Sequence, residues 1–159
     1  MLVALAKRLD PTRLAVHVSD HWQPGHGLAD SFGEDDVVCL NGYPDPREGT
    51  KWWMEGIAEL HRIYPDKPIL VTEFGGEADQ DQGWQVARLE TGFAGMKAPY
   101  VCGTVIWCWA DHPWDKTWLK PPLSPYGLYT RDRTPRRSVE VARKGFLEAQ
   151  ENFARSLFE

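Results

Sequence analysis

The chain has 159 residues, of which 42% are hydrophobic and 26% are charged, a balance that is typical of a globular chain and excludes an intrinsically disordered one. The formal net charge of -5 leaves no excess of cations for a phosphate backbone, so nucleic acid is not expected as a partner. No apolar run approaches the roughly 20 residues of a membrane-spanning helix, so we expect no membrane partner either.

The first residues and the cysteines indicate a reducing compartment. Met1 leads directly into an amphipathic pattern that lacks the charged, apolar and cleavage regions of a secretory signal. Cys39, Cys102 and Cys108 lie in apolar runs and are odd in number, which favours buried free thiols over a disulfide framework. We therefore expect a cytoplasmic protein.

The first half of the chain predicts a helix end, two strands and a helix. Residues 2–9 have the pattern of a helix that Asp10-Pro11 stops. Apolar runs at 14–18 and 37–40 predict two strands, with a weak helix signal around 28–32 between them. Thr50 is expected to cap the next helix. The apolar face of that helix comprises Trp53, Ile57, Leu60 and Tyr64.

The second half predicts two further strands, each followed by a helix. Residues 68–72 are apolar on both faces, as a parallel strand covered by helices must be, and Val86, Leu89, Phe93 and Met96 mark the next helix. Residues 103–109 predict the fourth strand, and a loop rich in proline and tryptophan follows at 110–126. Thr134-Pro135 is expected to open the last helix, whose apolar face comprises Phe146, Ala149, Phe153 and Leu157. This alternation predicts one parallel α/β domain over residues 1–159.

Polar or aromatic side chains follow every predicted strand, where the reactive groups of parallel α/β folds gather. They are Asp20 and His21, Asn41 and Tyr43, Glu73, and Trp107, Trp109 and Asp111. Glu73 is the strongest candidate for a catalytic carboxylate, because it directly follows an apolar strand and precedes two glycines that allow a tight turn. The alternative is a surface glutamate that pairs with a neighbouring cation.

Aromatic residues near Glu73 add to this interpretation. Tyr43 and Asn41 share one side of their strand, and a phenol that donates to Glu73 would orient the carboxylate and favour its charged form. The alternative is a core tyrosine with a satisfied hydroxyl. The chain has eight tryptophans, most of which should pack in the core. Those at or beyond a strand end, where a wall for a sugar ring is expected, are Trp107, Trp109, Trp114 and Trp118.

Signals for a metal or a basic binding patch are weak. The spacing of Asp20, His21 and His26 matches no strong ligand pattern. No cofactor is therefore indicated, and a divalent metal stays open, because no ligand set for one is recognisable in the sequence. The basic run at 131–137 is expected to be a solvated loop and helix start.

Four segments resemble motifs of retaining glycoside hydrolases. Residues 68–75, Pro-Ile-Leu-Val-Thr-Glu-Phe-Gly, resemble the seventh strand of retaining glycosidases with (β/α) barrels, in which this glutamate is the nucleophile. Residues 105–111 resemble the eighth strand of glycoside hydrolase family 2, the β-galactosidase and β-glucuronidase family, where the first tryptophan lines the sugar site. Residues 41–43 resemble the sixth-strand Asn-x-Tyr whose tyrosine hydrogen-bonds the nucleophile, and residues 127–135 resemble the link into the family's final helix.

The resemblance covers essentially the whole chain and implies a partial TIM barrel, equivalent to strands five to eight. The family's acid/base glutamate ends the fourth strand and would lie upstream. Glu73 is then the nucleophile and Tyr43 the residue that orients it. The implied substrate-binding residues are Asn41, Trp107, Trp109, His21 and Asp111. Glucuronidases carry Asn-x-Lys where this chain has residues 124–126, Ser-Pro-Tyr, so a glucuronidase specificity is disfavoured. The resemblance implies a β-galactosidase-like enzyme, and the sugar otherwise stays open, because family 2 relatives handle galactose, glucuronate and mannose with the same barrel.

A chain of this kind is expected to be inactive or nearly so by itself, because retaining hydrolysis needs two carboxyl groups about 5 Å apart. A half-barrel also leaves two sheet edges unpaired. We therefore expect a homo-oligomer or a complex with a complementary N-terminal half-barrel chain, acting on a carbohydrate substrate. The alternatives are a non-catalytic carbohydrate-binding module and a relic half-barrel that folds without function.

Overall fold

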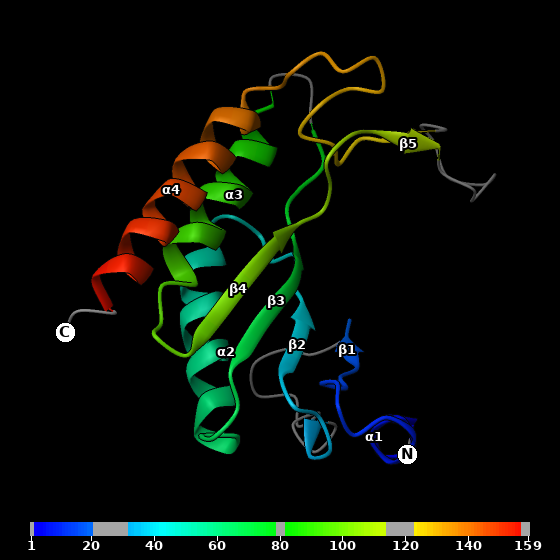
Figure 1. The fold of residues 1–159 in the computed structure, drawn as a ribbon. Coiled ribbons are helices and arrows are strands. Elements are labelled where there is room, and N and C mark those ends of the chain that lie inside the picture. The colour runs from blue at the N-terminus through cyan, green and yellow to red at the C-terminus, as the bar shows by residue number, and fades with distance from the viewer. Residues whose placement is uncertain (1, 21–31, 79–81, 114–122, 157–159) are drawn as a thin grey trace.

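The computed structural model describes residues 2–20, 32–78, 82–113 and 123–156 (Figure 1). The main elements in chain order are α1 (Leu2–Leu9), β1 (Val18–Ser19), β2 (Val38–Asn41), α2 (Gly49–Ile63), β3 (Ile69–Phe74), α3 (Gly83–Gly95), β4 (Val101–Ile106) and α4 (Ser138–Ser156). The four strands form one parallel sheet in the order β1-β2-β3-β4. The predicted α/β fold with a parallel sheet is confirmed, and it is consistent with part of a TIM barrel.

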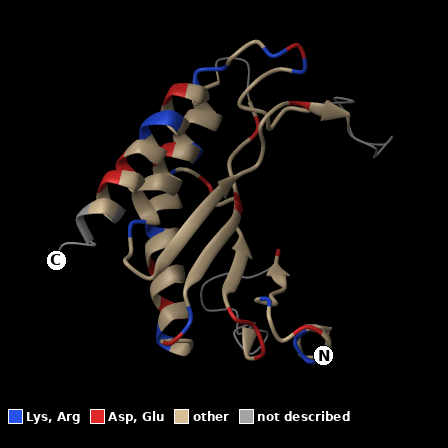
Figure 2. Ribbon diagram, viewed as in Figure 1, with Lys and Arg blue, Asp and Glu red and all other residues tan. Residues whose placement is uncertain are grey.

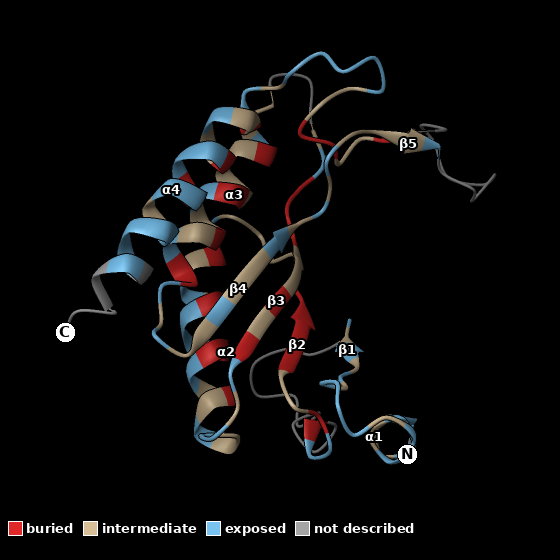
Figure 3. Ribbon diagram, in the orientation of Figure 1, coloured by how far each residue is buried: buried red, intermediate tan, exposed pale blue. Residues whose placement is uncertain are grey.

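One face of the sheet carries the core. Helices α2, α3 and α4 all lie along this face (Figure 1), and the buried residues of β2 and β3 continue into the adjoining sides of α2 and α3 (Figure 3). The buried core includes Val38, Leu40, Ile69 and Val71 from the strands and Trp53, Ile57, Leu60 and Leu89 from the helices. Removal of these apolar side chains from water is the main stabilisation of the sheet–helix layers.

Glycine brings α3 close to the sheet. A Cβ on Gly92 would lie 2.6 Å from the Phe74 ring, so only a residue without a side chain lets this helix approach β3. The same Phe74 ring packs edge-on against Phe93 at 5.1 Å between ring centroids. Close packing at the end of β3 therefore fixes the strand from which Glu73 projects.

Two predictions in the first half of the chain were wrong in detail. The first strand is only Val18–Ser19 instead of residues 14–18, and Leu14 is 76% exposed. Among the described residues, β1 is an edge strand that pairs with β2 alone. The residues before it bind aspartate side chains instead of a strand: the Ala15 N–H donates to Asp36 Oδ2 at 2.8 Å, and the His17 N–H donates to Asp35 Oδ1. Thr50 is not a cap, because α2 begins at Gly49 and its N-cap, Glu48, makes no side-chain capping bond. The Thr50 hydroxyl instead donates to the Thr91 carbonyl at 3.5 Å. The weak helix signal at 28–32 falls mainly outside the described residues.

The second half also departs from the expected boundaries. The fourth strand, β4, ends at Ile106, so Trp107 and Trp109 follow the strand instead of lying in it. The expected loop contains a short antiparallel pair, β5 (His112–Pro113) and β6 (Leu123–Ser124). Helix α4 begins at Ser138, because Pro135 forms a bridge with Tyr129 and the chain turns before the helix. Its predicted apolar face is incorrect in part, since Phe146 and Ala149 are exposed.

Of the helices that the structure describes, none combines the length and the apolar character required to span a bilayer.

Candidate functional site

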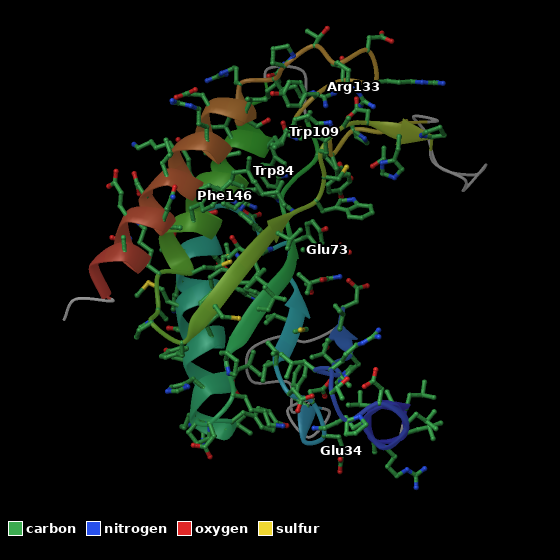
Figure 4. All side chains as sticks on the ribbon, viewed as in Figure 1. Glu34, Glu73, Trp84, Trp109, Arg133 and Phe146 are labelled. Carbon is green, nitrogen blue, oxygen red and sulfur yellow. The ribbon has the colours of Figure 1, made fainter. Side chains whose placement is uncertain are left out.

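Glu73 projects from the end of β3 on the face of the sheet turned away from α2 and α3 (Figure 4). It is the one charged residue of this strand (Figure 2). The register between β3 and β4 is irregular from Val71 to Phe74, and these two side chains are both buried in the core. Such an irregularity interrupts the alternation of side chains. Thr72 and Glu73, which lie between the two core residues, are therefore both directed to the opposite face.

Tyr43 holds the Glu73 carboxylate. The phenol Oη donates to Glu73 Oε2 at 2.7 Å, and the Gly42 backbone N–H donates to the Glu73 carbonyl at 2.9 Å. Burial, followed by the hydrogen bond to Glu73 and the charge of this carboxylate, raises the pKa of Tyr43 well above its usual value. Tyr43 therefore stays protonated at neutral pH and remains a hydrogen-bond donor to Glu73.

Asn41 connects the end of β1 to the end of β3. It is only 8% exposed, and its Oδ1 accepts a hydrogen bond from Thr72 Oγ1 at 2.8 Å. Its Nδ2 donates to Asp20 Oδ1 at 3.3 Å. The predicted proximity of Asn41, Tyr43 and Glu73 is thus present in the structure.

Trp107 lies beside the end of β3. Its backbone N–H donates to the Phe74 carbonyl at 2.9 Å. Gly75 has φ +155°, and a Cβ there would lie 2.4 Å from the Trp107 carbonyl oxygen, so glycine allows the two chain segments to meet. The Trp107 ring packs edge-on against His112 and remains 38% exposed, which leaves indole surface available beside the site.

Trp109 and Asp111 lie apart from Glu73. The Trp109 ring packs on Tyr129 at 4.5 Å between centroids and lines a groove with Ala142 and Phe146 of α4 (Figure 4). Both carboxylate oxygens of Asp111 accept hydrogen bonds from Arg136, each at 2.7 Å, so this side chain anchors a loop. The remaining predicted substrate residue, His21, lies outside the described residues.

Two polar residues with little exposed surface were not predicted, Gln85 near the site and Arg136 beside Asp111. Gln85 of α3 is 1% exposed, and its Nε2 lies within hydrogen-bonding distance of the carbonyls of Gly76, Tyr126 and Gly127, at 3.0 to 3.2 Å. It thereby links the loop after β3 to the segment after β6. The sequence signal that could have indicated its burial is its position four residues before Leu89, on the same face of the helix. The expectation that 131–137 is wholly solvated was wrong, because the Arg136 side chain is 11% exposed.

No described group of three or more histidine, cysteine, aspartate or glutamate side chains could hold a metal ion. His21 and His26 of the weak metal pattern lie outside the described residues. The three cysteines are free, as expected, but Cys102 is exposed instead of buried. Burial raises the pKa of Cys39 and of Cys108 to about 11, so both are thiols at neutral pH.

Sequence comparison finds β-glucuronidases. Human β-glucuronidase is 26% identical over an alignment of 171 residues that covers 92% of this chain and 25% of the human protein. β-Glucuronidase of Streptococcus agalactiae is 26% identical over 164 residues, which cover 92% of this chain and 27% of the bacterial protein. The chain thus spans about a quarter of the length of these curated relatives. No protein-family model matches the chain.

Structural comparison finds the same kind of enzyme. β-Glucuronidase from Dictyoglomus thermophilum superposes with a TM-score of 0.75 at 21% identity, over 91% of this chain and 28% of the enzyme. A family 2 β-galacturonidase from Eisenbergiella tayi superposes with a TM-score of 0.71 at 21% identity, over 92% of this chain and 29% of that protein. The structural likeness shows the fold, and the sequence relatives are glycoside hydrolases of the same kind. The chain is therefore related to glycoside hydrolase family 2, as its strand-end motifs predict.

Proposed function

We propose that the chain is the nucleophile-bearing half of a retaining glycoside hydrolase barrel, with residues 1–159 as one unit equivalent to strands five to eight. The observation that carries the proposal is the 2.7 Å hydrogen bond from Tyr43 to Glu73 at the carboxyl end of a parallel strand. Active sites of (β/α) barrels form at this end of the sheet. The relationship to family 2 supports the same assignment.

The proposed reaction begins with attack of the Glu73 carboxylate on the anomeric carbon of a β-linked sugar. Tyr43 occupies Oε2, which leaves Oε1 for the attack. A carboxylic acid from the missing half protonates the leaving oxygen, and water then hydrolyses the glycosyl ester, which gives retention of configuration. Asn41 holds the neighbouring strand end, and Trp107 packs against the sugar ring.

The sugar specificity that we propose for this chain differs from that of its β-glucuronidase relatives. Residues 124–126 stand where the glucuronidase motif has Asn-x-Lys, and the Tyr126 hydroxyl donates to Glu77 Oε1 at 3.0 Å. A tyrosine bound to a carboxylate offers no cation to a sugar acid. We therefore propose a β-galactosidase-like specificity.

The pure chain is expected not to hydrolyse 4-nitrophenyl β-glycosides at a measurable rate. A missing general acid removes about 10² to 10⁴ of rate acceleration, and the incomplete pocket weakens substrate binding further. Release of 4-nitrophenol is measured with the chain alone and with a complementary half-barrel that carries an acid/base glutamate. Turnover by the pure chain that disappears in a Glu73→Gln variant would show that the partner half is unnecessary.

The two edges of the sheet support the proposed need for a partner. Val18 of β1 is exposed at one edge. At the other edge, Val105 of β4 and Trp109 are exposed, with Trp109 at 63%. Unpaired strand edges and exposed apolar side chains favour association with another chain.

We expect light scattering to give a mass above the 18.1 kDa of one chain as the concentration rises, or after a complementary half-barrel is added. Either a second copy or this half would pair the free edges. A matched variant with Val105→Thr and Trp109→Ser is expected to associate less. A wild-type chain that remains monomeric under both conditions would contradict the proposed partner.

A non-catalytic carbohydrate-binding module is the second candidate. The observation in its favour is the partly exposed Trp107 beside a single carboxylate with an orienting phenol. This candidate predicts that galactosides quench tryptophan fluorescence and that Trp107→Ala removes the change, while Glu73 shows no reactivity toward activated sugars.

A further inference from the structure

Polar side chains from three neighbouring strands follow one another across the carboxyl edge of the sheet. Ser19 of β1 pairs with Leu40 of β2, and Asn41 of β2 pairs with Glu73 of β3. Asp20 comes directly after β1, and it accepts the hydrogen bond from Asn41 Nδ2. Asn41 thus holds the Asp20 carboxylate on the side of the sheet where Tyr43 binds Glu73.

Asp20 belongs electrostatically to the Glu73 site. Its charge adds to the raised pKa of Tyr43, behind the larger effects of burial, of Glu73 and of Tyr126. The Asp20 side chain is exposed, and the hydrogen bond from Asn41 uses only Oδ1. A carboxylate has about four acceptor sites, so Asp20 retains capacity for a ligand hydroxyl.

A third carboxylate, Glu77, is bound to Tyr126, the aromatic neighbour of Tyr43. The Tyr126 ring packs edge-on against Tyr43 at 5.9 Å between centroids, and its hydroxyl binds the exposed Glu77. Within the described ranges, no lysine or arginine forms an ion pair with Asp20, Glu73 or Glu77. Asp20 and Glu73 are the carboxylates that act on Tyr43, whereas Glu77 acts on Tyr126, where the Arg88 guanidinium opposes its charge.

We propose that Asp20 accepts a hydrogen bond from a hydroxyl of the bound sugar and that the Asp20 and Glu73 carboxylates make the site selective for neutral sugars over uronic acids. The inference rests on the proposed carbohydrate site at Glu73. A sugar hydroxyl donates well to a carboxylate, because charge-assisted hydrogen bonds are the stronger ones. A sugar carboxylate in the same position meets like charges, which weakens its binding by about tenfold.

The test compares sugars that differ only at C6. Methyl β-glycosides of galactose, glucose and mannose, each paired with its uronic acid, are titrated at pH 7 into isotopically labelled chain, with the Trp107 indole and Glu73 amide signals followed by NMR. We expect a neutral sugar to bind about tenfold more tightly than its acid. Asp20→Asn keeps the shape of the side chain and removes its charge. We expect it to weaken the binding of neutral sugars several-fold and to reduce the ratio of affinities, neutral sugar over uronic acid, to about threefold.

Asp132→Asn is the matched control, since it removes the same charge from an exposed loop residue. It should leave the affinities for the neutral sugar and for its uronic acid unchanged. Unchanged amide dispersion of Asp20→Asn establishes that the variant is folded. Equal or tighter binding of the uronic acids, or a ratio unaffected by Asp20→Asn, would overturn the inference and leave the sugar site intact. If no sugar shifts the Trp107 or Glu73 signals, the inference and the proposed function both fail.

Discussion

A glutamine at position 73 is expected to abolish covalent labelling of the chain by 2,4-dinitrophenyl 2-deoxy-2-fluoro-β-glycosides. Dinitrophenolate leaves without a proton, so the first step does not require the missing acid/base residue. The Glu73 carboxylate forms a bond to the anomeric carbon, and the bond from that carbon to the dinitrophenyl oxygen breaks with its electron pair. The fluorine opposes positive charge at the anomeric carbon, so hydrolysis of the ester is slow.

The expected result is one sugar per wild-type chain by intact mass and a labelling rate at least about 10³ lower for Glu73→Gln, since an amide oxygen is a poor nucleophile. Tyr43→Phe keeps the carboxylate and loses its orientation, so labelling about tenfold slower is expected. Glu77→Gln is the matched control, because it makes the same chemical change in the carboxylate bound by Tyr126. If Glu73→Gln is fully labelled and Glu77→Gln is not, the nucleophile is Glu77 and the assignment of Glu73 is wrong.

Replacement of Arg136 by methionine is expected to lower the free energy of unfolding by about 3 to 5 kcal/mol. Arg136 binds both oxygens of Asp111 at 2.7 Å and also donates to the Gly127 carbonyl at 2.7 Å. The variant leaves the Asp111 charge in a site where its side chain is only 9% exposed. Urea unfolding followed by circular dichroism and tryptophan fluorescence measures the loss as a lower midpoint at unchanged slope.

Two variants control the Arg136 result. Arg133→Met removes an exposed guanidinium from the same basic run and is expected to change stability by no more than about 0.5 kcal/mol. The double variant Asp111→Leu with Arg136→Met removes both buried charges and is expected to recover much of the loss. Equal losses for Arg133→Met and Arg136→Met, or no recovery in the double variant, would contradict a stabilising role of the buried pair.

The sequence was sufficient for the features that depend on local pattern. Apolar runs bounded by turn residues located β2, β3 and the helices between the strands, because burial against a helix layer requires that pattern. The side chain of Glu73 follows such a run, and its contact with Tyr43 follows from the parallel order of neighbouring strands. The proximity of Tyr43 and Glu73 could therefore be predicted from the sequence.

Features that depend on distant partners could not be predicted. Asp111 ends an aromatic motif that predicts substrate binding. It instead binds Arg136, which lies in the basic run at 131–137 that the sequence predicts to be solvated. In the sequence, Gln85 is only a polar residue of a predicted helix. Its role depends on the backbone carbonyls of another segment, to which its side chain donates. The late start of α4 depends on the bridge between Pro135 and Tyr129, which overrides the local capping signal.

The most direct measurement of the central claim is the identity of the residue that carries the sugar after labelling with the fluorinated glycoside. The labelled chain is digested at low pH and the modified peptide is fragmented by mass spectrometry. The account predicts a single modified peptide with the sugar on Glu73. A sugar on another residue, or an unlabelled chain whose circular dichroism shows it to be folded, would contradict the assignment of Glu73 as the nucleophile.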